Sequence, residues 1–303
     1  MIGPSSGNCE RNRPLNAEMK TGSGQLWFRA FKYTVYCLLA LNVWLFFLDD
    51  YAASKEVFVD GVTWSNLVEA FSATVDTLAW VILLLLFELE TAVIPDQKLQ
   101  GRLKWVLSAL RGICYAFIVY AFYGYVSKYF VVTDLIELGR VNVCALADQG
   151  YAWVATLDEY PRLTAETCAA VQGQPILQIA GTRIVGTPEQ LALAESLALT
   201  DIINAGDWLI VVALLEAEVW LQLKGMLSDR LLAINKWIKG FLYSVLFACA
   251  IYWGIDGDFL DFWDAFLWLV AFIFIELNIF EWHEEAGERV AEQAEPEQPA
   301  SAR

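Results

Sequence analysis

The chain of 303 residues contains a single histidine, His283, close to its C-terminal end. Bis-histidine haem sites, di-iron sites with Glu-x-x-His pairs and histidine-built zinc sites therefore lack their ligands. No Gly-x-Gly-x-x-Gly, Walker A, Gly-x-Ser-x-Gly or His-Glu-x-x-His motif occurs. We therefore expect no cofactor and no metal. A membrane enzyme that uses paired carboxylates is the least favoured function, because no nucleophile or substrate motif accompanies the acids.

Basic residues are also scarce. The chain has 20 Lys and Arg against 36 Asp and Glu, which gives a net charge of −16 and a pI of about 4.4. Contacts to nucleic-acid phosphates require a basic surface, so we expect no nucleic-acid partner.

Charged residues make up only 18% of the chain, whereas 57% of the residues are hydrophobic. A soluble domain carries about a quarter charged residues, and about 20 apolar residues span a bilayer as a helix. The pattern predicts an all-α polytopic membrane protein that contacts the lipid bilayer through six transmembrane helices. We place them at residues 27–48, 67–93, 104–127, 201–223, 236–254 and 261–281.

The distribution of Lys and Arg predicts the orientation. Basic residues gather around the start of the first, third and fifth spans and in the segments before them: Arg11, Arg13, Lys20, Arg29, Lys32, Lys98, Arg102, Lys104, Lys224, Arg230, Lys236 and Lys239. The first 25 residues are polar and lack the apolar core of a signal peptide. We therefore expect both termini in the cytoplasm, with the protein in a bacterial inner membrane.

Five regions follow from these spans. Residues 1–26 form a cytoplasmic arm, and 27–127 hold transmembrane helices 1 to 3. Residues 128–200 form a small extracytoplasmic α(+β) cap, and 201–282 hold helices 4 to 6. Residues 283–303 are rich in Glu, Ala, Pro and Gln and poor in large apolar side chains, which predicts a disordered acidic tail.

The cap carries two cysteines, Cys144 and Cys168, which we expect to form a disulfide in an oxidising compartment. Short helices are predicted over 133–157 and 163–171, and a hairpin over 176–179 and 182–185. Thr187 followed by Pro188 predicts the start of a helix that continues into the fourth span.

A repeated pattern runs through the second, fourth and sixth spans. Its copies are Asp76-x3-Trp80-x7-Glu88-x-Glu90, Asn204-x3-Trp208-x7-Glu216-x-Glu218 and Asp264-x3-Trp268-x7-Glu276-x-Asn278. The first, third and fifth spans also align, each beginning near a Trp: Trp27, Trp105 and Trp237. The chain is therefore predicted to be three helical hairpins in the same direction, around a pseudo-threefold axis along the membrane normal.

Helical phase limits which acids can act together. Positions fourteen apart, such as Asp76 and Glu90, differ by about 40° and share a face, whereas Glu88 projects about 160° from Glu90. The two sets of carboxylates therefore cannot line one pore. One set could face the central axis while the other faces the neighbouring helices.

Carboxylates inside a bilayer are costly unless they are paired, protonated or hydrated. The odd-numbered spans offer Arg111, Lys32 and Lys239 as charge partners, and Tyr33 and Tyr243 as hydrogen-bond donors. For any single acid, an ion pair that only fixes the helix register is therefore as good an explanation as a role in ion binding. Because five carboxylates face three bases at this depth, we expect some of the acids to be protonated, hydrated or ion-binding.

Two further features have a simple structural explanation beside a functional one. The repeated Trp residues are expected to pack in the bundle rather than to bind cations through their rings. The series Asp256, Asp258, Asp261 and Asp264 could attract cations, but it is too short for a calcium loop and resembles a solvated loop.

These observations favour a cation or proton channel or transporter. The candidate ion-binding or conduction residues are Glu88, Glu216, Glu276, Glu90, Glu218, Asp76 and Asp264. On this hypothesis, changing Glu88, Glu216 and Glu276 to Gln abolishes flux without unfolding the protein. The alternative is a sensor, scaffold or accessory subunit, bound to further copies of itself or to a membrane complex, in which the acids are structural.

Overall fold

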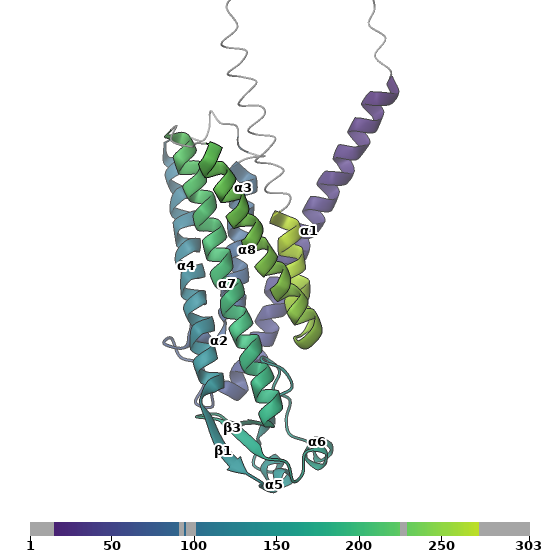
Figure 1. The fold of residues 1–303 in the computed structure, drawn as a ribbon, viewed down its shortest axis with the longest axis vertical. Coiled ribbons are helices and arrows are strands. Elements are labelled where there is room, and N and C mark those ends of the chain that lie inside the picture. Colours follow the sequence, from purple (N-terminus) through teal and green to yellow (C-terminus); the bar gives the residue numbers. More distant parts are fainter. Residues whose placement is uncertain (1–14, 91–93, 95–100, 225–228, 273–303) are drawn as a thin grey trace, which may run out of the picture.

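The computed structural model describes residues 15–90, 94, 101–224 and 229–272, and it is mostly helical. Long helices run side by side and form a bundle, and a small mixed domain lies at one end of it (Figure 1). The first helix, α1, starts at the opposite end of the molecule from this domain (Figure 1). The proposed site at Glu276 and the acidic tail lie outside the described residues.

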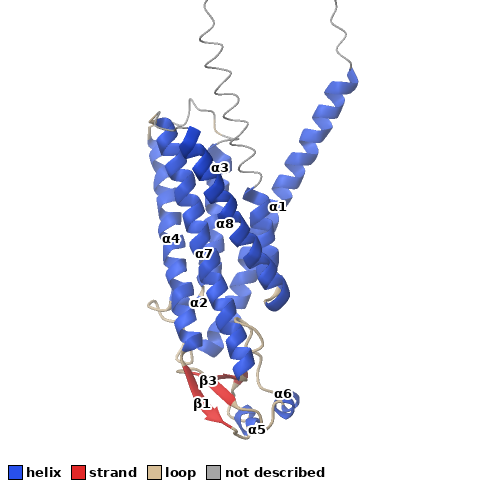
Figure 2. Cartoon of the chain, viewed as in Figure 1, coloured by secondary structure: helices blue, strands red, loops and turns tan. Residues whose placement is uncertain are grey.

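The bundle is built from α1 (Leu15–Val57), α3 (Ser72–Glu88), α4 (Arg102–Thr133), α7 (Pro188–Leu223) and α8 (Asp229–Asp256). A further helix covers residues 259–272. Among the described residues, four segments are long and apolar enough to cross a membrane: Leu26–Val57, Arg102–Thr133, Pro188–Glu218 and Ala233–Asp256. The prediction of a membrane-embedded, predominantly helical protein is therefore supported, and Figure 2 shows that β structure is confined to the small domain.

The predicted second span is interrupted in the structure. A four-residue helix, α2 (Leu67–Ala70), ends at Phe71, where the backbone leaves helical geometry with a φ of −130°, and α3 starts at the next residue. The described part of α3 has 17 residues, which is about 25 Å of helix. The break lets α2 pack against α4 while α3 packs against both α1 and α4.

Small residues allow the helices to approach closely. A side chain added at Gly124 of α4 would lie 3.0 Å from both the Ser72 Cβ atom and the Val68 carbonyl oxygen. Large apolar side chains such as Trp105, Phe130 and Phe241 instead point away from the bundle and are exposed. Outward apolar side chains around a packed helix bundle are what a lipid environment requires.

The domain at the end of the bundle is the predicted cap. It contains β1 (Leu135–Gly139), α5 (Val143–Ala147), β2 (Ala152–Trp153), α6 (Ala165–Ala170), β3 (Ile176–Ile179) and β4 (Ile184–Gly186). The four strands form one sheet in the order β1-β3-β4-β2, in which β2 and β4 are parallel and the other pairs are antiparallel.

The helix predicted over 133–157 is wrong for most of its length. This segment contains strands β1 and β2, with only the five-residue α5 between them. The reason is non-local: Leu135 pairs with Ile179, over forty residues later, and Ala152 pairs with Ile184. Strand formation depends on such partners more than on local preference.

Other local predictions are confirmed. Strands β3 and β4 form an antiparallel hairpin whose turn contains Gly181 with a φ of +74°, a conformation that favours glycine. Helix α7 starts at Pro188 and continues without a break to Leu223. Thr187 and Gln190 form a reciprocal cap, in which the Gln190 amide donates to the Thr187 hydroxyl at 3.4 Å and the Thr187 amide donates to the Gln190 side chain at 3.2 Å.

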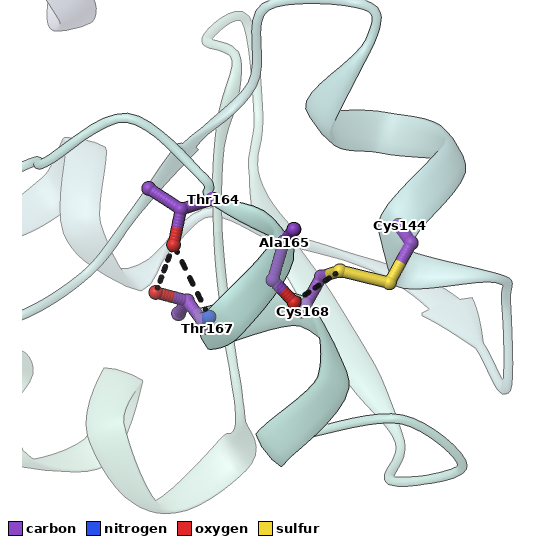
Figure 3. The surroundings of a disulfide bond; sticks show 5 residues. All are labelled: Cys144, Thr164, Ala165, Thr167 and Cys168. Atoms are coloured by element: carbon purple, nitrogen blue, oxygen red, sulfur yellow. Dashed lines mark hydrogen bonds between the residues drawn. A yellow bond between two sulfur atoms is a disulfide. The ribbon is translucent and has the colours of Figure 1, made fainter.

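The predicted disulfide is present and joins α5 to α6 (Figure 3). The Thr164 hydroxyl caps α6 by accepting from the Thr167 amide at 3.2 Å (Figure 3). Cys168 is buried among Val143, Trp153 and Ile176, so the bridge closes the small core of the cap.

We expect removal of this bridge by Cys144→Ser with Cys168→Ser to destabilise the cap by about 3 kcal/mol, because a closed loop of this length removes entropy from the unfolded chain. Limited proteolysis of the purified protein would measure the effect, with cleavage accelerating within the cap. The control is Cys37→Ser, which removes a free thiol from α1. An unchanged cleavage rate in the double variant would contradict the prediction.

Candidate functional site

The three repeated tryptophans meet inside the bundle. Trp80 of α3 lies 6.1 Å from Trp208 of α7 and 6.2 Å from Trp268 of the 259–272 helix, measured between ring centroids. The Phe272 ring packs against Trp208 in a tilted arrangement, with the ring centroids 4.4 Å apart. We call Trp80, Trp208 and Trp268 the tryptophan triad. Helices far apart in the sequence therefore present the same repeat position to one common centre.

A cavity of about 80 Å³ lies against the triad on the side of the cap. The polar residue of each repeat, Asp76, Asn204 or Asp264, lies on its wall. Each precedes its tryptophan by four residues, which places it on nearly the same helix face and about 6 Å along the axis. We call this space the cap-side cavity.

Further carboxylates from other elements surround the cap-side cavity. They come from α1, the cap, α7 and the start of the last helix: Asp49, Asp50, Asp158, Asp201, Asp258 and Asp261. Lys128 of α4 is the one basic residue among the described residues that line it. Eight carboxylates thus face a single ammonium group in a confined space, which creates a strong attraction for cations.

Neutral groups hold several of these acids in place. The Tyr125 hydroxyl donates to Asp76 at 3.3 Å, and the Asn42 amide donates to Asp264 at 2.7 Å. Asp50 accepts from the amide and the hydroxyl of Thr74, at 2.9 and 2.6 Å. These donors orient the carboxyl groups of Asp50, Asp76 and Asp264 without forming ion pairs with them.

Lys128 lies at the boundary between this cavity and a smaller one. Its ammonium group is 2.7 Å from the Asp158 carboxylate of the cap and 4.0 Å from that of Asp201. The second cavity, of about 40 Å³, shares Asp50, Lys128 and Asp158 with the first and is also lined by Tyr160. Burial raises the pKa of the Tyr160 phenol and the Asp158 charge adds to this, so the Tyr160 hydroxyl keeps its proton.

The carboxylates do not converge on a metal. Within the described ranges, no group of three or more Asp, Glu, Cys or His side chains is placed to hold a metal ion. A calcium site needs six to eight oxygen ligands around one point. The acids of the cap-side cavity are instead spread over its wall and act through their combined field.

The glutamates at the other end of the repeat lie outside this cavity. Lys32 of α1 approaches both oxygens of Glu88, at 2.7 and 2.9 Å, and the pair is buried. The hydroxyls of Tyr33 and Tyr36 also donate to Glu88, at 3.1 and 3.5 Å. The predicted partners Lys32 and Tyr33 therefore both contact this one carboxylate.

The remaining glutamates in the described part of the chain also have partners. Arg111 of α4 forms an ion pair with Glu90, and Tyr115 donates to Glu216 at 2.7 Å. Glu218 accepts from Lys239 of α8 at 3.2 Å and from Asn235 at 2.6 Å. The charge partners Arg111 and Lys239 thus contact the second glutamate of their respective pairs, Glu90 and Glu218.

Helix phase explains this arrangement. With Trp80 directed to the centre, Glu88 and Glu90 lie about 80° to either side of it. Glu88 therefore meets the preceding helix α1, and Glu90 meets the following helix α4. Glu216 and Glu218 repeat this pattern against α4 and α8. The expectation that one of the two sets would face the axis is not met by these four acids; each faces a neighbouring helix.

The cavity wall thus contains Asp76 and Asp264, two of the candidate conduction residues, and Asp258 and Asp261 of the series that resembles a solvated loop. Asp49, Asp50, Asp158, Asp201 and Lys128 are not singled out by the sequence. Lys128 carried a usable signal, because a base at the cap end of α4 stands apart from the basic side of the protein. Asp158 gave none, since the fold of the cap alone brings it to Lys128.

The fold and the cavity together describe a helix bundle with segments long and apolar enough to cross a membrane, a confined acidic site inside it and a small mixed domain at one end. The chain matches no protein-family model, and no curated protein or solved structure matches it significantly.

The buried pair gives a direct test of the structural role of these glutamates. Lys32→Met leaves Glu88 buried with its charge uncompensated, and we expect a loss of about 3–5 kcal/mol in the free energy of unfolding. The double variant Lys32→Met with Glu88→Met should recover most of that loss, because both charges are then absent. Unfolding in a denaturing detergent would measure both values.

Lys239→Met is the matched control, since its ion pair with Glu218 is more exposed, at 18% and 24% against 7% and 6% for Lys32 and Glu88. We expect a loss of about 1 kcal/mol or less there. Equal losses at the two pairs would contradict the assigned difference in burial.

Proposed function

We propose that this protein conducts or transports cations or protons across a membrane, and that the cap-side cavity is where they first bind. The observation that carries the proposal is the excess of eight carboxylates over one ammonium group around a cavity inside the bundle. Acidic clusters inside membrane bundles attract cations and relay protons. Asp76 and Asp264, with their neutral partners Tyr125 and Asn42, are the proposed ion-binding residues.

The tryptophan triad acts as the gate in this proposal. Beyond it, Leu84, Val211, Leu246 and Ala271 form a packed apolar layer. Hydrophobic constrictions of this kind stop ions because water does not fill them. Conduction therefore requires the triad to separate, and the described arrangement corresponds to a closed state.

We assign a structural role to Glu88, Glu90, Glu216 and Glu218. Each has a cationic or phenolic partner on a neighbouring helix, and such pairs fix the rotation of helices inside a bilayer. These contacts support the alternative function in part: a sensor, scaffold or accessory subunit of a membrane complex would need the same internal pairs. The acids of the cap-side cavity distinguish the transport function from the accessory function, because an accessory role does not require them.

The proposed architecture is six transmembrane helices arranged as three hairpins, with both termini cytoplasmic and residues 128–200 extracytoplasmic in a bacterial inner membrane. The convergence of the triad on one centre supports the repeat. The Cys144–Cys168 disulfide supports an oxidising compartment for the cap.

Flux through the purified protein in liposomes tests the function. We expect Asp76→Asn with Asp264→Asn to reduce cation or proton flux at least tenfold, because both changes remove charge from the cavity and keep side-chain size. Asp256→Asn is the matched control, since this acid belongs to the same series but is exposed and lies off the cavity wall.

The same liposome experiment should include the triple variant in which Glu88, Glu216 and Glu276 are changed to Gln. A structural role predicts reduced stability with flux per folded molecule preserved. The proposal would be contradicted if folded wild-type protein passed neither protons nor cations under any applied potential. That result would favour the accessory role.

Orientation can be tested by labelling with a membrane-impermeant maleimide. In a variant with Cys9, Cys37, Cys114 and Cys249 changed to Ser, we expect Gln174→Cys in the cap to react in intact cells. Arg230→Cys at the start of α8 should react only after the membrane is permeabilised. The opposite labelling pattern would reverse the proposed topology.

A further inference from the structure

One further buried aspartate differs from the eight that line the cavity. Asp207 lies in the middle of α7, between Asn204 and Trp208, and only 7% of it is exposed. Its Oδ2 atom is completely buried and has no hydrogen-bond partner. No salt bridge involving Asp207 forms among the described residues. No repeat pattern singles out Asp207, because the equivalent positions of the other two copies are Ala79 and Leu267.

The buried residues that follow Asp207 on α7 and flank its neighbour Cys249 on α8 are apolar. Val211 in the next turn of α7 is buried, as are Leu246 and Ala250 on α8. On the α4 side, the Phe122 ring lies 3.4 Å from a Cβ atom built at the neighbouring Gly206. The Cys249 thiol of α8 is close enough to interact electrostatically with Asp207. It is the titratable group that α8 brings to this carboxyl, and it provides no positive charge.

An ionised carboxylate in this setting is strongly unfavourable. Removing a charge from water without a partner costs so much that the group normally neutralises instead. The other bundle acids avoid this: Glu88 is paired with Lys32, and Asp264 accepts from Asn42. Asp207 has neither kind of partner, so its carboxyl holds a proton.

Asp207 also continues a row of polar residues that begins at the cavity wall. Asp201, Asn204 and Asp207 are spaced three residues apart, so they form one row along α7 with a rise of about 4.5 Å per step. Asp201 and Asn204 both line the cap-side cavity. Asp207 is the next position of this row, one step deeper in the bundle and turned towards α8.

We propose that Asp207 is an intramembrane proton-binding site, reached from the cap-side cavity along the row formed by Asp201 and Asn204. In the resting state the carboxyl is neutral. Release breaks its O–H bond and transfers the proton to water that enters from the cavity, which leaves a carboxylate and a hydronium ion. Uptake is the reverse step and consumes no other reactant. The site requires only the geometry of α7 and stands whether or not the protein carries ions across the membrane.

Infrared difference spectroscopy on the folded protein tests this without any measurement of flux. Wild type should show a carbonyl stretching band of a protonated carboxylic acid that is absent in Asp207→Asn. The band should shift in heavy water and give way to carboxylate bands as the pH is raised. Asp256→Asn, an exposed acid, should leave the protonated-acid band unchanged.

Two results would overturn the proposal. Loss of carboxylate bands instead of the acid band in Asp207→Asn would show that the group is ionised. An acid band that neither shifts in heavy water nor titrates would show a permanently neutral, structural residue. If Asp207→Asn does not fold, wild type can be labelled with dicyclohexylcarbodiimide and the modified residues mapped by mass spectrometry. Modification of Asp207 that declines at alkaline pH supports the site. An unmodified Asp207 rejects it.

Discussion

The contact among Trp80, Trp208 and Trp268 is the constraint on which the rest of the bundle depends. Once an indole from each repeat is directed to the centre, helical geometry fixes every other position of the pattern. The polar residue four positions earlier must line the space beside the triad, as Asp76, Asn204 and Asp264 do. The glutamates eight and ten positions later must turn to opposite sides, towards the neighbouring helices.

The two layers of acid therefore differ in what surrounds them. Glu88 has the Lys32 ammonium group beside it, and its charge is compensated inside the bundle. Asp76 and Asp264 line the cavity and are held by neutral donors, without an ion pair. Between the layers lies packed apolar core. The protein thus combines a frame of paired charges with a cavity whose acids outnumber its one base, and the proposed function rests on the second arrangement.

Features set by local geometry were predictable from the sequence. The apolar helices, the pairing of Cys144 with Cys168 and the cap at Thr187 follow from composition, spacing and turn chemistry. Features set by distant contacts were not. Strand β1 depends on partners in β3, and the cavity wall depends on Asp158 arriving from the cap. The repeated glutamates were the natural choice for the flux test, because the number of charges can be counted in a sequence. The partner of each charge cannot be assigned from the sequence.

The position of Asp207 bears on how far into the bundle a proton or a cation can go. Cations attracted to the cap-side cavity meet the triad and the apolar layer beyond it. A proton can travel further than a hydrated ion because it moves between polar groups and needs no space of its own size. Asp201, Asn204 and Asp207 form a row of such groups that leads from the cavity wall to the depth of Trp208. If Asp207 binds a proton as we propose, the proton is the species for which this bundle contains a binding group beside the tryptophan triad.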